Sequence, residues 1–142
     1  MAKRVTLARM SDTSRLPIEA RELTDSWLTH VLRSGGAIEA AAVVGHRWEL
    51  LGQQGAAGTI GRVSLTYDRT SPAAPDSVVI KFATAHAPTR VMLHRFGFYR
   101  SEIEFYRQLG ADAGIPVPRC FFADIDPESG YFALVLERSE EH

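Results

Sequence analysis

The stretch Val78-Val79-Ile80-Lys81-Phe82 places one cation inside a compact apolar run that has the length of a β-strand. Successive side chains of a strand point to opposite faces, so Lys81 shares a face with Val79, and the other three residues share the opposite face. An ammonium group in apolar surroundings needs a partner. This setting suits phosphate binding, because a rigid strand holds the point charge at a defined position. The alternative is an edge-strand lysine whose stem lies on the sheet while its ammonium group stays in water.

A helix expected at residues 98–109 offers a partner for Lys81. Its inward stripe is predicted to consist of Phe98, Glu102, Phe105 and Leu109, flanked by Tyr99, Ile103 and Tyr106. Burying an unpaired carboxylate is costly, so Glu102 is expected to pair with Lys81 and hold it in position for phosphate. The alternative places Glu102 at the border of the stripe, where it reaches solvent or bonds Arg107.

A glycine-rich turn precedes the lysine strand. Apolar residues over 40–51 predict one strand, and alternation over 63–67 predicts a second. Small residues between these strands let backbone amides cradle phosphate oxygens, and the glycines there are Gly52, Gly55, Gly58 and Gly61. The spacing departs from G-x-G-x-x-G, because Ala56 stands where the first glycine of that pattern belongs. The alternative is a hairpin turn that needs positive φ angles.

The remaining elements complete an α+β order. Thr24 is expected to cap a helix that stops at Ser34-Gly35-Gly36, with an apolar face made by Trp27, Leu28, Val31 and Leu32. Strands are predicted at 119–125 and 131–137, and the residue types between them favour a turn. The predicted order is therefore helix, three strands, helix and two strands.

Composition limits the partners and the compartment. The 16 basic and 17 acidic side chains nearly cancel, so neither nucleic acid nor a membrane is expected as a partner. Cys120 is the only cysteine, which excludes an internal disulfide and leaves no thiol pair for zinc. No apolar run has the length of a signal-peptide core or a membrane span. These features predict a cytoplasmic protein with a loosely ordered leader over 1–22 and one domain over 23–142.

Together these segments resemble a known family. The glycine-rich turn, the lysine strand, the helix sequence S-E-I-E-F-Y-R-Q-L and the strand Y-F-A-L-V-L-E resemble the N-terminal lobe of aminoglycoside-phosphotransferase and choline-kinase-like enzymes. The resemblance is nearest to their ecdysteroid-kinase-like branch. It covers roughly residues 23–137, and its most specific part is Glu102, Phe105 and Tyr106 after a strand lysine. It implies a kinase-like N-lobe with a five-stranded, mostly antiparallel sheet, one long αC-like helix and an N-terminal helix.

The resemblance also implies a set of nucleotide-binding residues, namely Lys81, Glu102, Gly55, Gly58, Gly61, Glu137 and Arg138. Lys81 is implied to contact the ATP phosphates, with Glu102 positioning it. The glycine turn is implied to cover the nucleotide. The backbone near Glu137 and Arg138 is implied to approach adenine, although the alternative for the Glu137 side chain is that it only braces the hinge.

The implied function is the ATP-binding half of a small-molecule O-phosphotransferase, which transfers the γ-phosphoryl group of ATP to a hydroxyl acceptor. In this family the catalytic and metal-binding aspartates lie in a C-terminal lobe beyond the hinge, and that lobe is absent from a chain ending at His142. No catalytic residue or metal ligand is therefore assigned here, and Mg²⁺ with ATP is expected only in a complete parent protein. Whether this chain is itself an enzyme stays open at the level of sequence.

Two other functions compete with this one. A non-catalytic binding or regulatory remnant would need a partner to cover the apolar surface beneath the hinge. A dinucleotide-binding oxidoreductase fragment is disfavoured, because the glycine turn joins two predicted strands rather than a strand and a helix. The cations Arg90, His94, Arg95 and Arg100 are expected to form a solvated surface, with a phosphate-attracting flank as the alternative.

Overall fold

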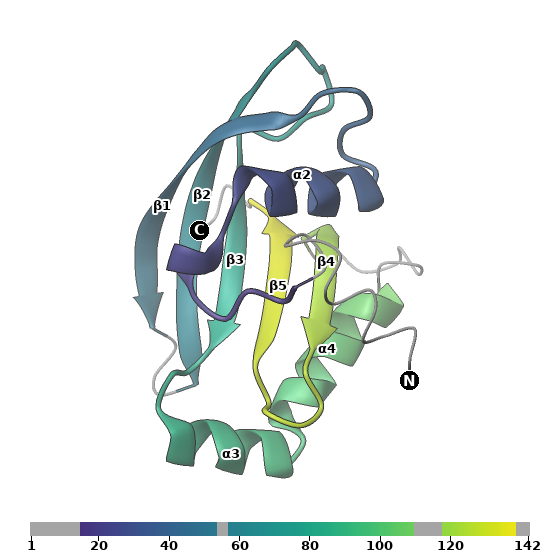
Figure 1. The fold of residues 1–142 in the computed structure, drawn as a ribbon. Helices are drawn as coiled ribbons and strands as arrows, with labels where there is room; N and C mark the ends of the chain where they lie inside the picture. Colours follow the sequence, from purple (N-terminus) through teal and green to yellow (C-terminus); the bar gives the residue numbers. More distant parts are fainter. Residues whose placement is uncertain (1–14, 54–56, 110–117, 139–142) are drawn as a thin grey trace, which may run out of the picture.

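A computed structural model describes residues 15–53, 57–109 and 118–138 of the chain, and Figure 1 shows its fold. The leader predicted over 1–22 is described only from residue 15, and this part includes a short 3-10 helix. The elements in chain order are η2 (Ala20–Glu22), α2 (Asp25–Ser34), β1 (Val43–Gln53), β2 (Gly58–Tyr67), β3 (Ser77–Ala83), α3 (Ala87–Arg95), α4 (Phe98–Leu109), β4 (Cys120–Ile125) and β5 (Phe132–Glu137).

The strands form one five-stranded sheet in the order β1-β2-β3-β5-β4, and each neighbouring pair is antiparallel. The predicted α+β class and the antiparallel sheet are therefore confirmed. Strand β3 lies in the middle of the sheet, where Lys81 is paired with Ile60 of β2 and Leu134 of β5. Lys81 is consequently not an edge-strand residue.

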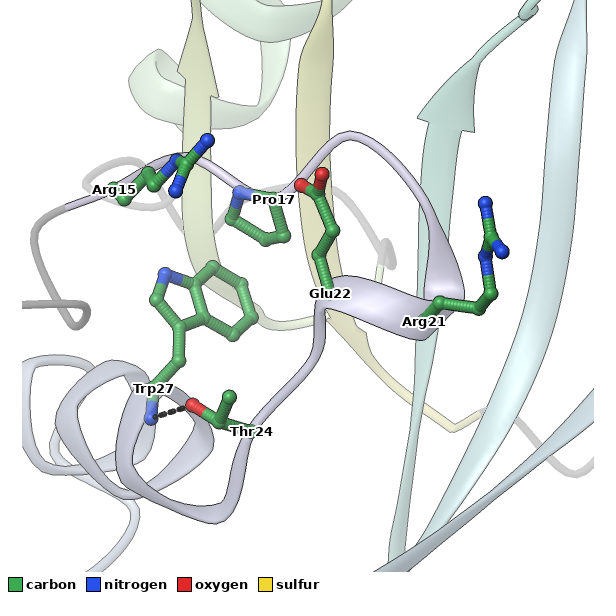
Figure 2. Close-up of a pocket in the computed structure, with 6 residues that line it drawn as sticks. All are labelled: Arg15, Pro17, Arg21, Glu22, Thr24 and Trp27. Carbon is green, nitrogen blue, oxygen red and sulfur yellow. Dashed lines mark hydrogen bonds between the residues drawn. The ribbon is translucent and has the colours of Figure 1, made fainter.

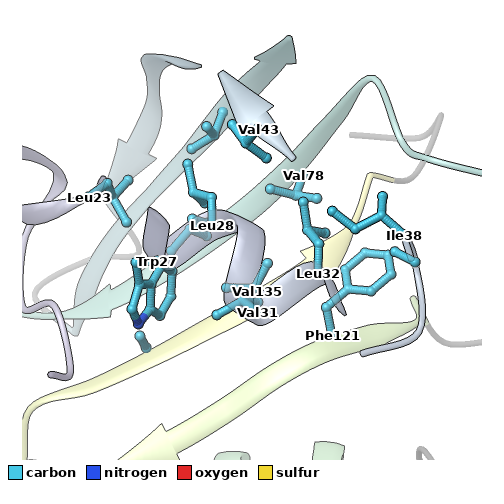
Figure 3. Close-up of a cluster of buried hydrophobic side chains, with 14 of the residues drawn as sticks. Leu23, Trp27, Leu28, Val31, Leu32, Ile38, Val43, Val78, Phe121 and Val135 are labelled. Atoms are coloured by element: carbon cyan, nitrogen blue, oxygen red, sulfur yellow. The ribbon is translucent and has the colours of Figure 1, made fainter. Parts of the chain in front are cut away.

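Helix α2 covers one face of the sheet, as Figures 1 and 3 show. Thr24 begins the helix as predicted, because its side-chain oxygen accepts a hydrogen bond from the backbone N–H of Trp27 at 3.0 Å. The helix buries the predicted apolar face, made by Trp27, Leu28, Val31 and Leu32. These side chains share a core with inward residues of the central strands, including Val78, Ile80, Phe82 and Val135.

Helix α4 covers the other face, where a second core forms. Tyr99 and Ile103 are buried there at 3% and 0% exposure and pack with Phe132, Leu134 and Leu136. The predicted inward stripe of α4 is therefore wrong by one position, because the buried stripe begins at Tyr99 rather than at Phe98. Phe98 and Phe105, which belong to that stripe, are 62% and 47% exposed. The side chain of Leu109 lies outside the described residues.

Helix α3 is an element that the sequence did not predict. It begins after His86, whose side chain caps the Thr89 N–H, and Pro88 occupies its first turn. Figure 1 places α3 at the end of the sheet, away from α2. Among the described residues, none of the helices is long and apolar enough to span a membrane.

Two of the four cations expected at a solvated surface instead attach α3 to the β4–β5 turn. The Arg90 guanidinium lies 3.9 Å from the centre of the Tyr131 ring and donates to the Ser129 carbonyl oxygen at 3.2 Å. His94 Nε2 lies 2.7 Å from the Pro127 carbonyl oxygen. The expected solvated surface is therefore wrong for Arg90 and His94. Backbone carbonyl oxygens of the turn face the helix and accept hydrogen bonds from these side chains.

Candidate functional site

The candidate site centres on an ion pair between β3 and α4. The Lys81 ammonium group donates a hydrogen bond to Glu102 Oε2, and the two side chains are 15% and 30% exposed. Lys81 lies on the α4 face of the sheet, because it alternates with residues that belong to the α2 core. The structure therefore brings together the two residues whose pairing the sequence predicted. Arg107, the alternative partner for Glu102, bonds Asp124 instead at 3.0 Å.

Aromatic side chains of α4 surround the pair. Tyr99 and Tyr106 lie three residues before and four residues after Glu102, so they neighbour it on the helix surface. Burial is the main cause that raises the pKa of both phenols above the ordinary range, and the Glu102 carboxylate adds to the rise. Glu102 thus reaches Lys81 across a surface that is largely shielded from water.

Two glycines of the β1–β2 hairpin, Gly58 and Gly61, have packing roles. Gly61 lies against the Trp48 ring, where an added Cβ would stand 2.2 Å from the nearest ring atom. Gly58 lies against β3, where an added Cβ would stand 2.3 Å from the Phe82 carbonyl oxygen. Neither has a positive φ angle. Close approach therefore explains both glycines without a ligand, and Gly55 lies outside the described residues.

Tyr99 connects α4 to the turn end of this hairpin, at the residue just before β2. Its hydroxyl donates a hydrogen bond to the Ala57 carbonyl oxygen at 2.7 Å and accepts one from the Thr84 N–H at 3.4 Å. Its ring packs edge-on against Phe132 with the ring centres 4.8 Å apart. Sequence reasoning treated Tyr99 only as a flanking residue of the stripe. The signal that could have found it is a hydroxyl on an otherwise apolar helix face, which must find a partner when buried.

The predicted hinge residues lie at the end of β5, and both are exposed. Glu137 Oε1 accepts a hydrogen bond from the Arg119 N–H at 3.3 Å, and the Glu137 N–H donates to the Arg119 carbonyl oxygen at 2.7 Å. The Glu137 side chain thus braces the chain just before β4. Arg138 follows β5, and its side chain is exposed.

Described residues also line cavities away from the ion pair. Figure 2 shows a pocket of about 240 Å³ at the start of α2, lined by Arg15, Pro17, Arg21, Glu22, Thr24 and Trp27. A second cavity of about 430 Å³ lies between residues near Arg15 and the β4–β5 hairpin. Arg21 of the first pocket is already paired with Glu19 at 3.1 Å. Neither cavity is lined by Lys81 or Glu102.

The acidic residues of the β4–β5 hairpin have structural partners. Asp124 bonds Arg107 at 3.0 Å, and Asp126 accepts hydrogen bonds from Glu128 N–H and the Ser129 hydroxyl, both at 3.0 Å. The bond from the Glu128 N–H is the main cause that lowers the pKa of Asp126. Within the described ranges, no group of three or more His, Cys, Asp or Glu side chains is placed to hold a metal ion.

No protein-family model, curated protein or solved structure matches the chain. The class of this protein is therefore described from its fold and its site alone. This is an α+β protein in which a five-stranded antiparallel sheet lies between two helices. A lysine of the central strand pairs with a glutamate of the helix that covers it.

Proposed function

We propose that this chain is the ATP-binding lobe of a small-molecule O-phosphotransferase. The observation that carries the proposal is the ion pair between Lys81 on the central strand and Glu102 on α4. A largely buried ammonium group held by a carboxylate has a fixed position, which suits binding of the ATP phosphates. The kinase-like resemblance of the same residues supports this assignment.

In this proposal each side chain has one task. Lys81 offers its charge to the phosphates, and Glu102 keeps the ammonium group from turning away. The β1–β2 hairpin lies beside β3 and would cover the nucleotide, and Tyr99 holds the turn end of the hairpin. The backbone after β5 would approach the adenine. The γ-phosphoryl group would pass to a hydroxyl of a small molecule, with the base and the Mg²⁺ ligands supplied by a further lobe of a complete parent protein. A cytoplasmic location, where ATP is abundant, belongs to the same proposal.

Labelling with an amine-reactive ATP analogue tests the proposal directly. The chain contains two lysines, Lys3 and Lys81, so mass spectrometry of peptides assigns any modification without ambiguity. We expect the analogue to modify Lys81, and we expect MgATP but not NADH to protect it. Modification of Lys81 that MgATP does not reduce contradicts the proposal. Selective protection by NADH would replace it with dinucleotide binding.

Titration of MgATP into variants provides a second test. Lys81→Met removes the phosphate contact, and we expect the dissociation constant to rise by about tenfold or more, because hydrogen bonds to charged groups contribute roughly 1.5–3 kcal/mol. Arg107→Met is the matched control, since it removes the cation of another α4 ion pair that lies between α4 and β4. An ATP affinity that is equal in wild type and Lys81→Met excludes a phosphate role for Lys81.

A further inference from the structure

Helix α3 exposes several apolar side chains and turns two polar ones toward the protein. Its exposed side consists of Ala87, Pro88, Val91, Met92 and Arg95, and Phe96 follows directly. Val91 and Met92 are 46% and 48% exposed, and Phe96 is 70% exposed. The polar side chains Arg90 and His94 face the protein and hold the helix to the β4–β5 turn. A helix that is fixed in this way presents apolar residues to its surroundings, which is unusual for a solvated surface.

The turn between α3 and α4 extends this apolar surface. Gly97 has a φ angle of +82°, and nothing lies within 4 Å of the position that a Cβ would occupy. On either side of it, Phe96 and Phe98 are 70% and 62% exposed. The chain therefore displays two phenylalanine rings on an open turn at the end of the molecule where Figure 1 shows α3. We call Val91, Met92, Phe96 and Phe98, with Arg95 and Arg100, the α3 surface.

The charge of this segment is entirely positive. Residues 84–101 contain three arginines and two histidines but no aspartate or glutamate, although the whole chain has a formal net charge of −1. Arg90 is directed inward, whereas Arg95 and Arg100 are exposed and lie close to Phe96 and Phe98 in the sequence. An apolar surface flanked by exposed arginines is complementary to an anionic surface with an apolar interior.

We propose that the α3 surface docks onto an anionic lipid bilayer. In this arrangement α3 lies along the membrane surface, and Val91, Met92, Phe96 and Phe98 enter the interfacial region. Arg95 and Arg100 contact the headgroup phosphates. The near-zero net charge of the chain predicts no membrane partner. That prediction concerns the total charge, whereas the positive charge of the α3 surface is local. The proposal does not depend on nucleotide binding.

A second copy of the chain fits the α3 surface less well. A two-fold symmetric contact brings the same patch of each subunit together, so it would gather four arginines in one interface, and the α3 surface contains no acidic residue to pair with them. Like charges brought together in an interface disfavour the contact. An anionic bilayer attracts the arginines instead of repelling them, and its interfacial region can bury the rings of Phe96 and Phe98.

Vesicle co-sedimentation of the full chain tests the proposal. We expect binding to vesicles of phosphatidylcholine with phosphatidylserine, and little binding to phosphatidylcholine alone. Phe96→Ser combined with Phe98→Ser should weaken partitioning by about tenfold or more, through lost apolar burial. Arg95→Gln and Arg100→Gln should each weaken it about fivefold at low salt. Because all four side chains are exposed, circular dichroism should show an unchanged fold.

Matched variants on β1 serve as controls. Val44→Ser with Leu50→Ser removes apolar side chains that are 54% and 57% exposed, and Arg47→Gln removes an exposed arginine. These variants should bind vesicles as the wild type does. A wild-type chain that stays in the supernatant with both vesicle types overturns the proposal, as do α3-surface variants that sediment like wild type. A dimer that Phe96→Ser with Phe98→Ser dissociates assigns the surface to a second copy instead.

Discussion

At the scale of single residues, the Lys81–Glu102 pair should contribute to stability as well as to binding. Both charges are partly withdrawn from water, so removing one leaves the other without its partner. We expect Lys81→Met and Glu102→Gln each to lower the free energy of unfolding by about 1–3 kcal/mol. The double variant should lose less than the sum, with a coupling of about 1 kcal/mol measured by urea denaturation.

The Arg107–Asp124 pair supplies the comparison for this cycle. Its side chains are 49% and 51% exposed, so solvent screens their attraction. The same cycle on Arg107→Met and Asp124→Asn should give a coupling below about 0.5 kcal/mol. Equal couplings for the two pairs would mean that burial gives Lys81 and Glu102 no special interaction.

Tyr67 should make stability depend on alkaline pH. Its hydroxyl donates to the Pro75 carbonyl oxygen at 2.7 Å, and burial, aided by the Asp76 carboxylate, raises the pKa of Tyr67 to about 12. In the unfolded chain a tyrosine loses its proton near pH 10. Between these values the unfolded state holds fewer protons than the folded state, so stability is complete below pH 10 and falls as the pH rises toward 12.

Tyr67→Phe isolates this contribution from that of other tyrosines. The phenylalanine variant has no phenol to titrate at this position, so the difference in unfolding free energy between wild type and variant should shrink from pH 9 to pH 12. Urea denaturation at several pH values measures it. A difference that stays constant from pH 9 to pH 12 would show that Tyr67 has the same pKa in the folded and unfolded states.

At the scale of elements, helix α4 acts on the β1–β2 hairpin through one hydroxyl. Tyr99→Phe keeps the ring against Phe132 but removes the hydrogen bond to the Ala57 carbonyl oxygen. We expect a loss of about 1 kcal/mol in stability and faster amide hydrogen exchange over residues 57–60. Tyr106→Phe is the control, since its hydroxyl makes no hydrogen bond to the residues that the structure describes. Unchanged exchange over 57–60 in Tyr99→Phe would show that the hairpin does not depend on this contact.

The same helix shows what an apolar pattern can predict. The period of 3.6 residues correctly gave the helix and placed Glu102 near Lys81. It could not decide which of two adjacent stripes faces the sheet, because Phe98 and Phe105 on one are as apolar as Tyr99 and Ile103 on the other. The buried stripe also makes the hydrogen bonds of Tyr99 and the contact with Phe132, which are tertiary contacts that periodicity does not contain.

Helix α3 was missed for a related physical reason. Sequence patterns detect a helix when its apolar face is buried and its polar face is solvated. In α3 several apolar side chains are exposed instead, and Arg90 and His94 hold the helix through carbonyl oxygens that lie more than thirty residues later in the chain. The visible local signals were His86 as a cap and Pro88 in the first turn.

At the scale of the whole molecule, strand order could not be derived from alternation alone. Alternation correctly assigned the two faces of β3, and residue types correctly gave the β4–β5 hairpin. The insertion of β5 beside β3, with β4 at the edge, depends on long-range packing. Successive residues of β5 belong to opposite cores, since Leu134 lies in the α4 core and Val135 in the α2 core. Burial on both faces is why β5 is apolar from Phe132 to Leu136.

Because β3 and β5 contribute to both cores, the two faces should unfold together. Ile103 is fully buried on the α4 face, and Ile103→Ala should lower the free energy of unfolding by about 2–5 kcal/mol. Both tryptophans belong to the α2 core, so their fluorescence reports on the opposite face. In urea, the fluorescence and far-ultraviolet circular dichroism transitions of Ile103→Ala should shift equally and coincide. A fluorescence transition that stays at its wild-type position while the circular dichroism moves would show that the α2 face holds its structure without α4.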